Sequence, residues 1–216
     1  MRGLNHVVFS FLWMGIAISA PGQTRPETSL SKVGELIVST SFNEPTPKTR
    51  KKAIHGWQAA IGEWWIEDEA LHGDELPEDN HHSSCTYKIE ATDLIISAKF
   101  RLGTASQLAI GCRDSVAPHH HLARTYVTKD AIWVTRMSGI SKTTKSEKLA
   151  ELKIPLDPEA WHTLTIEILG DHFQARVNGQ LIQARHERFQ DAKGIVALIS
   201  KGQGAQFKDV SIWKAM

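Results

Sequence analysis

Three consecutive histidines, His119–His121, are the clearest candidates for chemistry in this chain. In an extended segment His119 and His121 point to one side and His120 to the other. Imidazoles titrate near neutral pH, bind transition metals and hydrogen-bond hydroxyl groups, so this run could supply acid and base, a metal site or sugar contacts. A solvated loop whose histidines have no function is the alternative. Arg113 and Arg124 flank the run and are expected to orient hydroxyl or carbonyl groups of a substrate.

A second polar segment, residues 72–82, mixes acidic and imidazole side chains, among them Glu75 and His81. Such a loop could hold a general acid and base, or offer oxygen ligands to calcium. It lacks the regular acidic spacing of a calcium loop, so a divalent ion is possible but not indicated, and no cofactor is expected. The set proposed for catalysis is His119, His121, Glu75 and His81, and a plain polar loop is the alternative for this segment.

Tryptophan is frequent, with seven in the chain. Trp64 and Trp65 are adjacent, and adjacent strand residues point to opposite faces, so one of the two could be left to stack on a pyranose ring. Lys99 lies on the polar side of an alternating strand. Packing in the core or on a solvated sheet face is the alternative. The residues assigned to substrate binding are Arg113, Arg124, Trp65, His120 and Lys99.

These residues must be positioned by short strands, because apolar and polar residues alternate with period two along most of the chain. The clearest runs are 96–103, 107–113, 163–169 and 172–177. Asn178-Gly179 between two such runs predicts a two-residue hairpin, since both residues tolerate positive φ. About twelve strands are expected and at most one short helix, near 185–192. This pattern predicts an all-β protein, a β-sandwich or jelly roll.

The N-terminal residues 1–22 have the three parts of a secretory signal peptide. Arg2 precedes the uncharged apolar stretch Val7–Ile18, and small residues follow. The stretch is too short for a membrane span, which needs about 20 residues. We therefore expect a secreted or periplasmic protein without a membrane span after signal removal. Residues 23–35 are expected to be a tether, and residues 36–216 a single domain.

Charge and cysteine content restrict the function further. The chain has 25 Lys+Arg against 24 Asp+Glu, a balance that argues against a nucleic-acid module, which should carry a basic excess. Export would permit a disulfide between Cys85 and Cys112 if their Cα atoms lay within about 7 Å. Two small buried hydrophobic side chains are the alternative. Oligomeric state stays open.

Several segments together resemble the secreted bacterial 3-keto-disaccharide hydrolase domain of the concanavalin A-like jelly-roll superfamily. They are Phe42, Gly56-Trp57, Trp64–Leu71, Trp161–Glu167, Val177–Gly179, Gly194–Leu198 and Phe207–Ile212. The resemblance implies a concanavalin A-like jelly-roll sandwich with a carbohydrate ligand on a concave face. Two positions depart from the family pattern: Ile199 stands where glutamine is usual, and Glu69 where glycine is common.

The resemblance implies cleavage of a glycosidic bond in a 3-keto glycoside. The keto group acidifies the neighbouring C2–H, so a base such as histidine could start an elimination while a second group protonates the leaving oxygen. A non-catalytic, lectin-like glycan-binding or adhesion module is the alternative, and Ile199 favours it.

Overall fold

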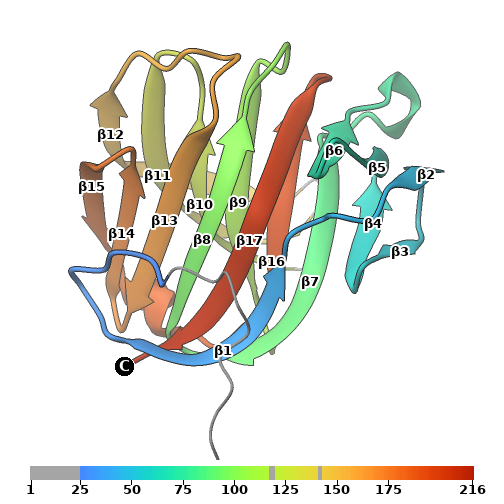
Figure 1. Ribbon diagram of the computed structural model, residues 1–216. Helices are drawn as coiled ribbons and strands as arrows, with labels where there is room; N and C mark the ends of the chain where they lie inside the picture. Colours follow the sequence, from blue (N-terminus) through green and yellow to red (C-terminus); the bar gives the residue numbers. More distant parts are fainter. Residues whose placement is uncertain (1–24, 117–119, 141–142) are drawn as a thin grey trace, which may run out of the picture.

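Alternating apolar and polar residues produce two antiparallel sheets that pack face to face (Figure 1). The computed structural model describes residues 25–116, 120–140 and 143–216. Within these ranges it contains 17 strands, more than the twelve or so expected. The all-β sandwich is confirmed. The extra strands include pieces as short as Thr46–Thr49 and Ala53–Ile54, which are too short to show an alternation in sequence.

The two sheets have nine and eight strands. The nine-stranded sheet has the order β15 (Gln180–Arg185), β14 (His172–Val177), β13 (His162–Leu169), β8 (Leu94–Arg101), β17 (Ala205–Ala215), β6 (Ala70–Asp74), β5 (Glu63–Glu67) and β2 (Thr46–Thr49), with β1 (Val33–Thr40) paired to β17. The eight-stranded sheet has the order β12 (Lys145–Lys153), β11 (Ala131–Ser138), β10 (His121–Val127), β9 (Gln107–Asp114), β16 (Lys193–Lys201), β7 (Ser83–Ala91), β4 (Trp57–Ile61) and β3 (Ala53–Ile54). Figure 1 views the sandwich from the nine-stranded side.

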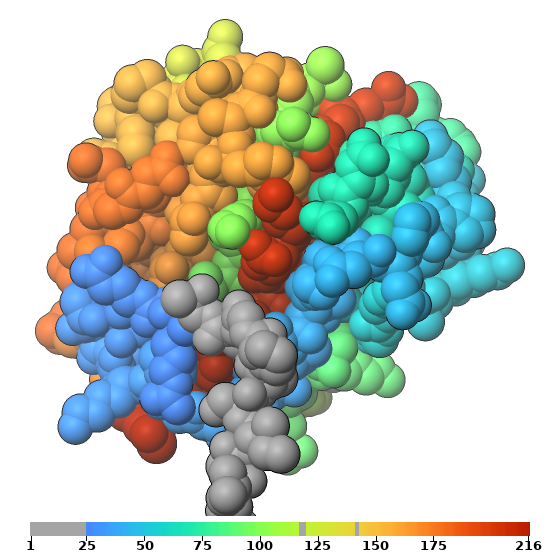
Figure 2. Space-filling model, in the orientation of Figure 1, coloured from blue at the N-terminus to red at the C-terminus, as the bar shows by residue number. Residues whose placement is uncertain are grey.

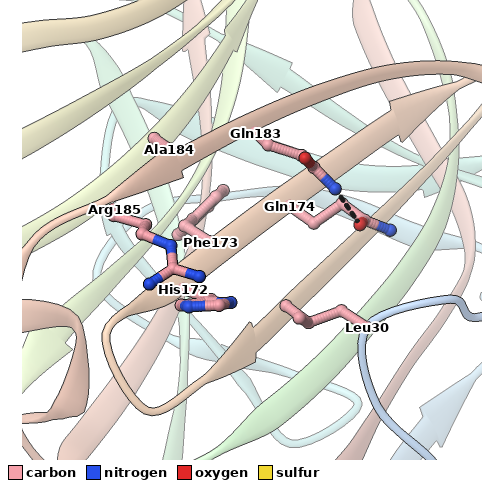
Figure 3. A pocket seen from close by; sticks show the side chains of 7 residues that line it. All are labelled: Leu30, His172, Phe173, Gln174, Gln183, Ala184 and Arg185. Atoms are coloured by element: carbon pink, nitrogen blue, oxygen red, sulfur yellow. Dashed lines mark hydrogen bonds between the residues drawn. The ribbon is translucent and has the colours of Figure 1, made fainter.

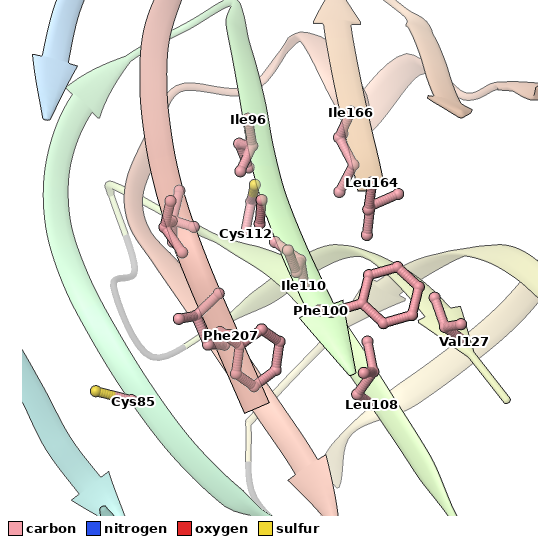
Figure 4. Close-up of a cluster of buried hydrophobic side chains, with 14 of the residues drawn as sticks. Cys85, Ile96, Phe100, Leu108, Ile110, Cys112, Val127, Leu164, Ile166 and Phe207 are labelled. Carbon is pink, nitrogen blue, oxygen red and sulfur yellow. The ribbon is translucent and has the colours of Figure 1, made fainter. Parts of the chain in front are cut away.

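The core fills the space between the sheets (Figure 4). Cys85 and Cys112 both lie in it as free thiols. They belong to β7 and β9, and β16 runs between these two strands. Burial raises the pKa of both thiols, that of Cys112 to about 11, so neither is a reactive thiolate. The two cysteines are therefore buried hydrophobic side chains, and the disulfide considered from sequence is not formed.

The turns follow from residue type where positive φ is needed. Asn178 and Gly179 have φ of 48° and 83° and join β14 to β15, which confirms the predicted hairpin. Asp68 and Glu69 make the same kind of turn between β5 and β6 with φ of 50° and 57° and no glycine.

The described residues form two short 3₁₀ turns, and one of them lies where the helix was expected. They are η1 (Pro77–Asp79) and η3 (Glu187–Gln190), and the described part of the chain contains no α-helix. The segment between β15 and β16, near which the helix was expected, has room only for η3. Accordingly, no described helix is long and apolar enough to cross a membrane.

The N-terminal segment is bound to the sandwich earlier than expected, because a buried carboxylate holds it. Glu167 on β13 is 1% exposed, and its carboxylate accepts hydrogen bonds from the backbone N–H groups of Ser29, Leu30 and Ser31 at 3.0, 3.0 and 2.9 Å. The Ser31 hydroxyl and the Gln174 amide donate to it as well. Residues 29–31, part of the expected tether, therefore lie on the outer face of the nine-stranded sheet, and residues 33–35 already belong to β1, which pairs with β17.

Glu167→Ala should release this segment. Removal of the carboxylate leaves three backbone donors without their acceptor, so amide hydrogen exchange at Ser29–Ser31 should accelerate at least tenfold. Global stability should fall by about 1–2 kcal/mol. Hydrogen–deuterium exchange with mass spectrometry measures the first effect. Glu151→Ala, which removes an exposed carboxylate of β12, is the control and should leave exchange at these residues unchanged.

Candidate functional site

The candidate site lies on the outer face of the eight-stranded sheet, where three predicted residues meet. On β9, Leu108, Ile110 and Cys112 point into the core, so Arg113 points outward. Strand register places His121 opposite Arg113, and Arg124 opposite Gly111. The antiparallel pairing of β9 and β10 therefore brings together two arginines and a histidine that are separated in sequence.

Arg124 is at the centre of this group. Its Nη2 donates to Nδ1 of His121 at 3.0 Å, and its Nη1 donates to the Tyr126 hydroxyl at 3.2 Å. Arg124 and His121 are only 8% and 7% exposed. Gly111 makes this arrangement possible, since a Cβ there would lie 2.7 Å from Cγ of Arg124. The guanidinium is thus fixed by hydrogen bonds to a histidine and a tyrosine, and the Arg124 side chain occupies the space that Gly111 leaves open.

The electrostatics of the group are strongly positive. The pKa of His121 is lowered to about 3, mainly by burial and then by the nearby charges of Arg124, Arg113, His81 and His120 in that order. Burial and Arg124 also lower the pKa of Arg113. His121 is therefore a neutral imidazole at physiological pH, and its Nδ1 is free of a proton to accept from Arg124.

An aromatic pair continues the site along β10 and β11. Tyr126 and Trp133 are opposite in register, and their rings stack with centroids 5.1 Å apart at 12°. Small and aliphatic residues, Ala109, Ala197 and Ile199, pack beside Tyr126 on the same face. The sequence interpretation missed Tyr126 and gave Trp133 no role. The period-two step from Arg124 to Tyr126 was a signal that could have placed Tyr126 on this face.

Glu75, from the second polar segment, is engaged elsewhere. Its Oε1 lies 3.3 Å from Nδ1 of His82, and its Oε2 accepts from the backbone of Gly202 at 2.7 Å. It is not among the charges that act on His121. His81 lines a cavity of about 240 Å³ with Arg50, Asp79 and neighbouring residues, and its charge reaches His121. Glu75 therefore fixes a loop, while His81 borders the candidate site.

The three histidines of the run 119–121 differ in what the structure shows of them. His121 is inside the group, and the carbonyl of His120 accepts from the Asp114 amide at 3.0 Å at the end of β9. His119 lies outside the described residues.

Trp65 and Lys99 lie on the opposite side of the molecule, on the outer face of the nine-stranded sheet. Trp65 stacks on His72 with centroids 4.9 Å apart, and Nζ of Lys48 covers its ring at 4.2 Å. Lys99 pairs with Asp209 at 2.8 Å. The structure thus separates these two residues from Arg113, Arg124 and His121, and they cannot share one site with them.

Two hollows of the described structure lie on that opposite face. Lys99 and Asp209 line one of about 1000 Å³ beside the N-terminal segment; Figure 2 shows this face, with red residues of β17 at the bottom of a hollow between orange and teal segments. A second cavity of about 390 Å³ lies between Leu30 and the β14–β15 hairpin (Figure 3). Gln183 donates to Gln174 there at 2.8 Å. Both hollows follow from the way the N-terminal segment crosses the sheet.

Metal ligands do not gather in the described residues. In residues 25–116, 120–140 and 143–216, no three His, Cys, Asp or Glu side chains lie close enough to hold a metal ion.

One family model and several solved structures are similar to this chain. Residues 42–213 match the model of a family described as "3-keto-alpha-glucoside-1,2-lyase-like domain". No curated protein matches the sequence. Among solved structures, carbohydrate-binding module CBM66 from Bacillus subtilis is 19% identical, with a TM-score of 0.62 over 74% of this chain and 96% of that one. Porphyranase B from Zobellia galactanivorans is 10% identical, with a TM-score of 0.61 over 91% and 98%. At these identities the likeness shows the fold alone, and it confirms the jelly roll.

Proposed function

Because the chain belongs to the 3-keto-alpha-glucoside-1,2-lyase-like domain family, we propose that it binds a carbohydrate on the outer face of the eight-stranded sheet without cleaving it. The protein is a carbohydrate-active jelly roll, and the proposal concerns which face it uses and what it does there. Export from the cytoplasm, predicted from residues 1–22, is part of the proposal.

The residues around Arg124 support a sugar site. A fixed guanidinium, a tyrosine hydroxyl and an imidazole offer donors and acceptors to sugar hydroxyls. The stacked rings of Tyr126 and Trp133 offer an apolar surface to the C–H side of a pyranose once the Lys148 side chain, whose Nζ lies 5.0 Å from the centre of the Trp133 ring, moves aside. Polar groups beside an aromatic surface match the two kinds of surface that a sugar ring presents.

The charges around His121 are the single observation that favours binding over cleavage. Hydrolysis of a glycosidic bond needs a proton donor and a base, normally two carboxyl groups. All charges that act on His121 are positive, and among the described residues no carboxylate lies within 4.0 Å of Arg113, His121 or Arg124. A pKa of about 3 also makes His121 a weak base. Ile199, where the family pattern has glutamine, adds an apolar side chain to this face.

Elimination from a 3-keto glycoside is the second candidate, since His121 is neutral beside two guanidinium groups. Its imidazole would take the C2 proton, and the C–H electrons would form an enolate whose oxygen the arginines could hold. Collapse of the enolate would break the bond from C1 to the leaving oxygen, which would take the proton back from the imidazolium.

Trp133→Ala distinguishes a site on this face from one elsewhere. Loss of the indole removes half of the aromatic pair, and affinity for a bound glycan should fall about tenfold, or about 1.4 kcal/mol. Isothermal titration calorimetry against a panel of soluble polysaccharides measures it. Trp65→Ala, on the opposite face, is the matched control and should retain affinity.

Two results would contradict the proposal. Equal loss of affinity in both tryptophan variants would move the site away from the eight-stranded sheet. Release of free sugar from a 3-keto glucoside by the wild type, lost in His121→Gln, would replace binding by elimination.

A further inference from the structure

We propose that Arg113 and Arg124 bind the anionic substituent of a glycan, a carboxylate or a sulfate ester, so that the ligand of this face is an acidic polysaccharide. The inference rests on the proposed sugar site and adds the chemical class of its ligand.

The two guanidinium groups have no counter-ion in the part of the chain that the structure describes. Other arginines of the eight-stranded sheet and its borders do: Arg50 lies 2.9 Å from Glu78, Arg136 2.9 Å from Glu147, and Arg188 3.4 Å from Asp114. Arg124 instead donates to a neutral imidazole and a phenol. Two positive charges on one face without a neutralising carboxylate favour an anionic ligand.

Burial makes the absence of a counter-ion unfavourable. Arg124 is 8% exposed, and Nε of Arg113 is buried without a hydrogen-bond partner. A buried donor without an acceptor destabilises the free protein, because it has lost water and gained nothing in exchange. An oxyanion from outside would supply the acceptor. Guanidinium groups match carboxylate and sulfate oxygens because their parallel N–H groups can donate to two oxygens at once.

Strand geometry places the two arginines for a shared ligand. Arg113 lies opposite His121, and Arg124 lies opposite Gly111, two positions before Arg113 on β9. The arginines are therefore diagonal neighbours on one face, and such pairs have Cα atoms about 7–8 Å apart, within reach of long side chains. His121 lies beside both and accepts one hydrogen bond from Arg124, but as a neutral imidazole it does not neutralise the arginine charges. Trp133 and Tyr126 follow on the same face for the sugar ring.

Polysaccharides that differ in charge test the inference. Titration calorimetry would use polygalacturonate for the carboxylate, a sulfated galactan for the sulfate ester, and neutral galactan as the uncharged reference. At least one acidic polymer should bind ten times more tightly than neutral galactan, and its affinity should fall with added sodium chloride. Arg113→Gln and Arg124→Gln should each lower that affinity at least tenfold, and by a larger factor than they lower the affinity for neutral galactan.

Arg185→Gln is the matched control, since it removes one exposed arginine charge at the edge of the other sheet. It should leave all affinities unchanged, and circular dichroism should show native folding in every variant. Arg113→Lys keeps the charge but loses the paired N–H groups of the guanidinium, so its affinity for the acidic polymer should lie between those of Arg113→Gln and the wild type.

The negative results distinguish the proposed anionic ligand from the proposed sugar site. Neutral galactan bound as tightly as both acidic polymers, with equal losses for all three polymers in the arginine variants, overturns the anionic ligand and leaves the sugar site. Equal losses in Arg185→Gln would reduce the effect to overall charge and also overturn it. Absence of binding to every polysaccharide contradicts the sugar site itself.

Discussion

Lys193→Ala is expected to lower the free energy of unfolding by about 4 kcal/mol. Lys193 is fully buried at the start of β16, and its Nζ donates to the carbonyl oxygens of Thr92 and Phe189. The variant leaves both carbonyls without a donor and opens a cavity the length of the lysine chain. Chemical denaturation followed by tryptophan fluorescence measures the change.

Two further variants separate the causes. Lys193→Met fills the cavity but cannot donate, and it removes the unfavourable burial of the ammonium, which lowers the pKa of Lys193. It should therefore lose only about half as much stability. Lys201→Ala, at the exposed end of the same strand, should change stability by less than about 0.5 kcal/mol. A change below about 1 kcal/mol for Lys193→Ala would show that β16 does not need this anchor.

Acidification from pH 8 to pH 4 should lower the free energy of unfolding by about 3 kcal/mol through His121 alone. Its pKa in the folded protein is about 3, lowered mainly by burial and then by Arg124 and Arg113. An unfolded histidine has a pKa near 6.5, so the unfolded chain takes up a proton below that pH while the folded protein does not. This contribution to stability is complete above about pH 6.5 and is lost progressively as the pH falls toward 3.

His121→Gln isolates this effect, because all other titrating groups are shared with the wild type. The variant should show a shallower fall of unfolding free energy between pH 6.5 and 4, corresponding to one proton fewer taken up on unfolding. Urea titrations at pH 7.5, 5.5 and 4.5 provide the comparison. Parallel profiles for the two proteins would show that His121 titrates normally in the fold.

The strands could be predicted from sequence because burial on one face leaves a period-two pattern, as at Leu108, Ile110 and Cys112. The hairpin at Asn178-Gly179 could also be predicted, since its backbone needs positive φ and these two residue types tolerate it. The hairpin at Asp68-Glu69 was not, because neither residue type requires that conformation. The short strands β2 and β3 have too few residues to show any period.

The site could be predicted only in part. Alternation identified Arg113 as outward-facing, and it identified Lys99 in the same way. It does not say to which sheet a strand belongs, so residues from two opposite faces were placed in one set. Long-range strand pairing decides that membership, and it depends on contacts between distant segments that no local pattern contains.

The contact of Glu167 with residues 29–31 also determines how this domain would be presented to its surroundings. The first described residues, Arg25, Pro26 and Glu27, lie on the nine-stranded side, where they line the large hollow. Arg113, Arg124 and Trp133 lie on the other side of the sandwich. If the N-terminal end were attached to a surface or to another protein, the attachment would leave the arginine face directed outward, open to a long polymer.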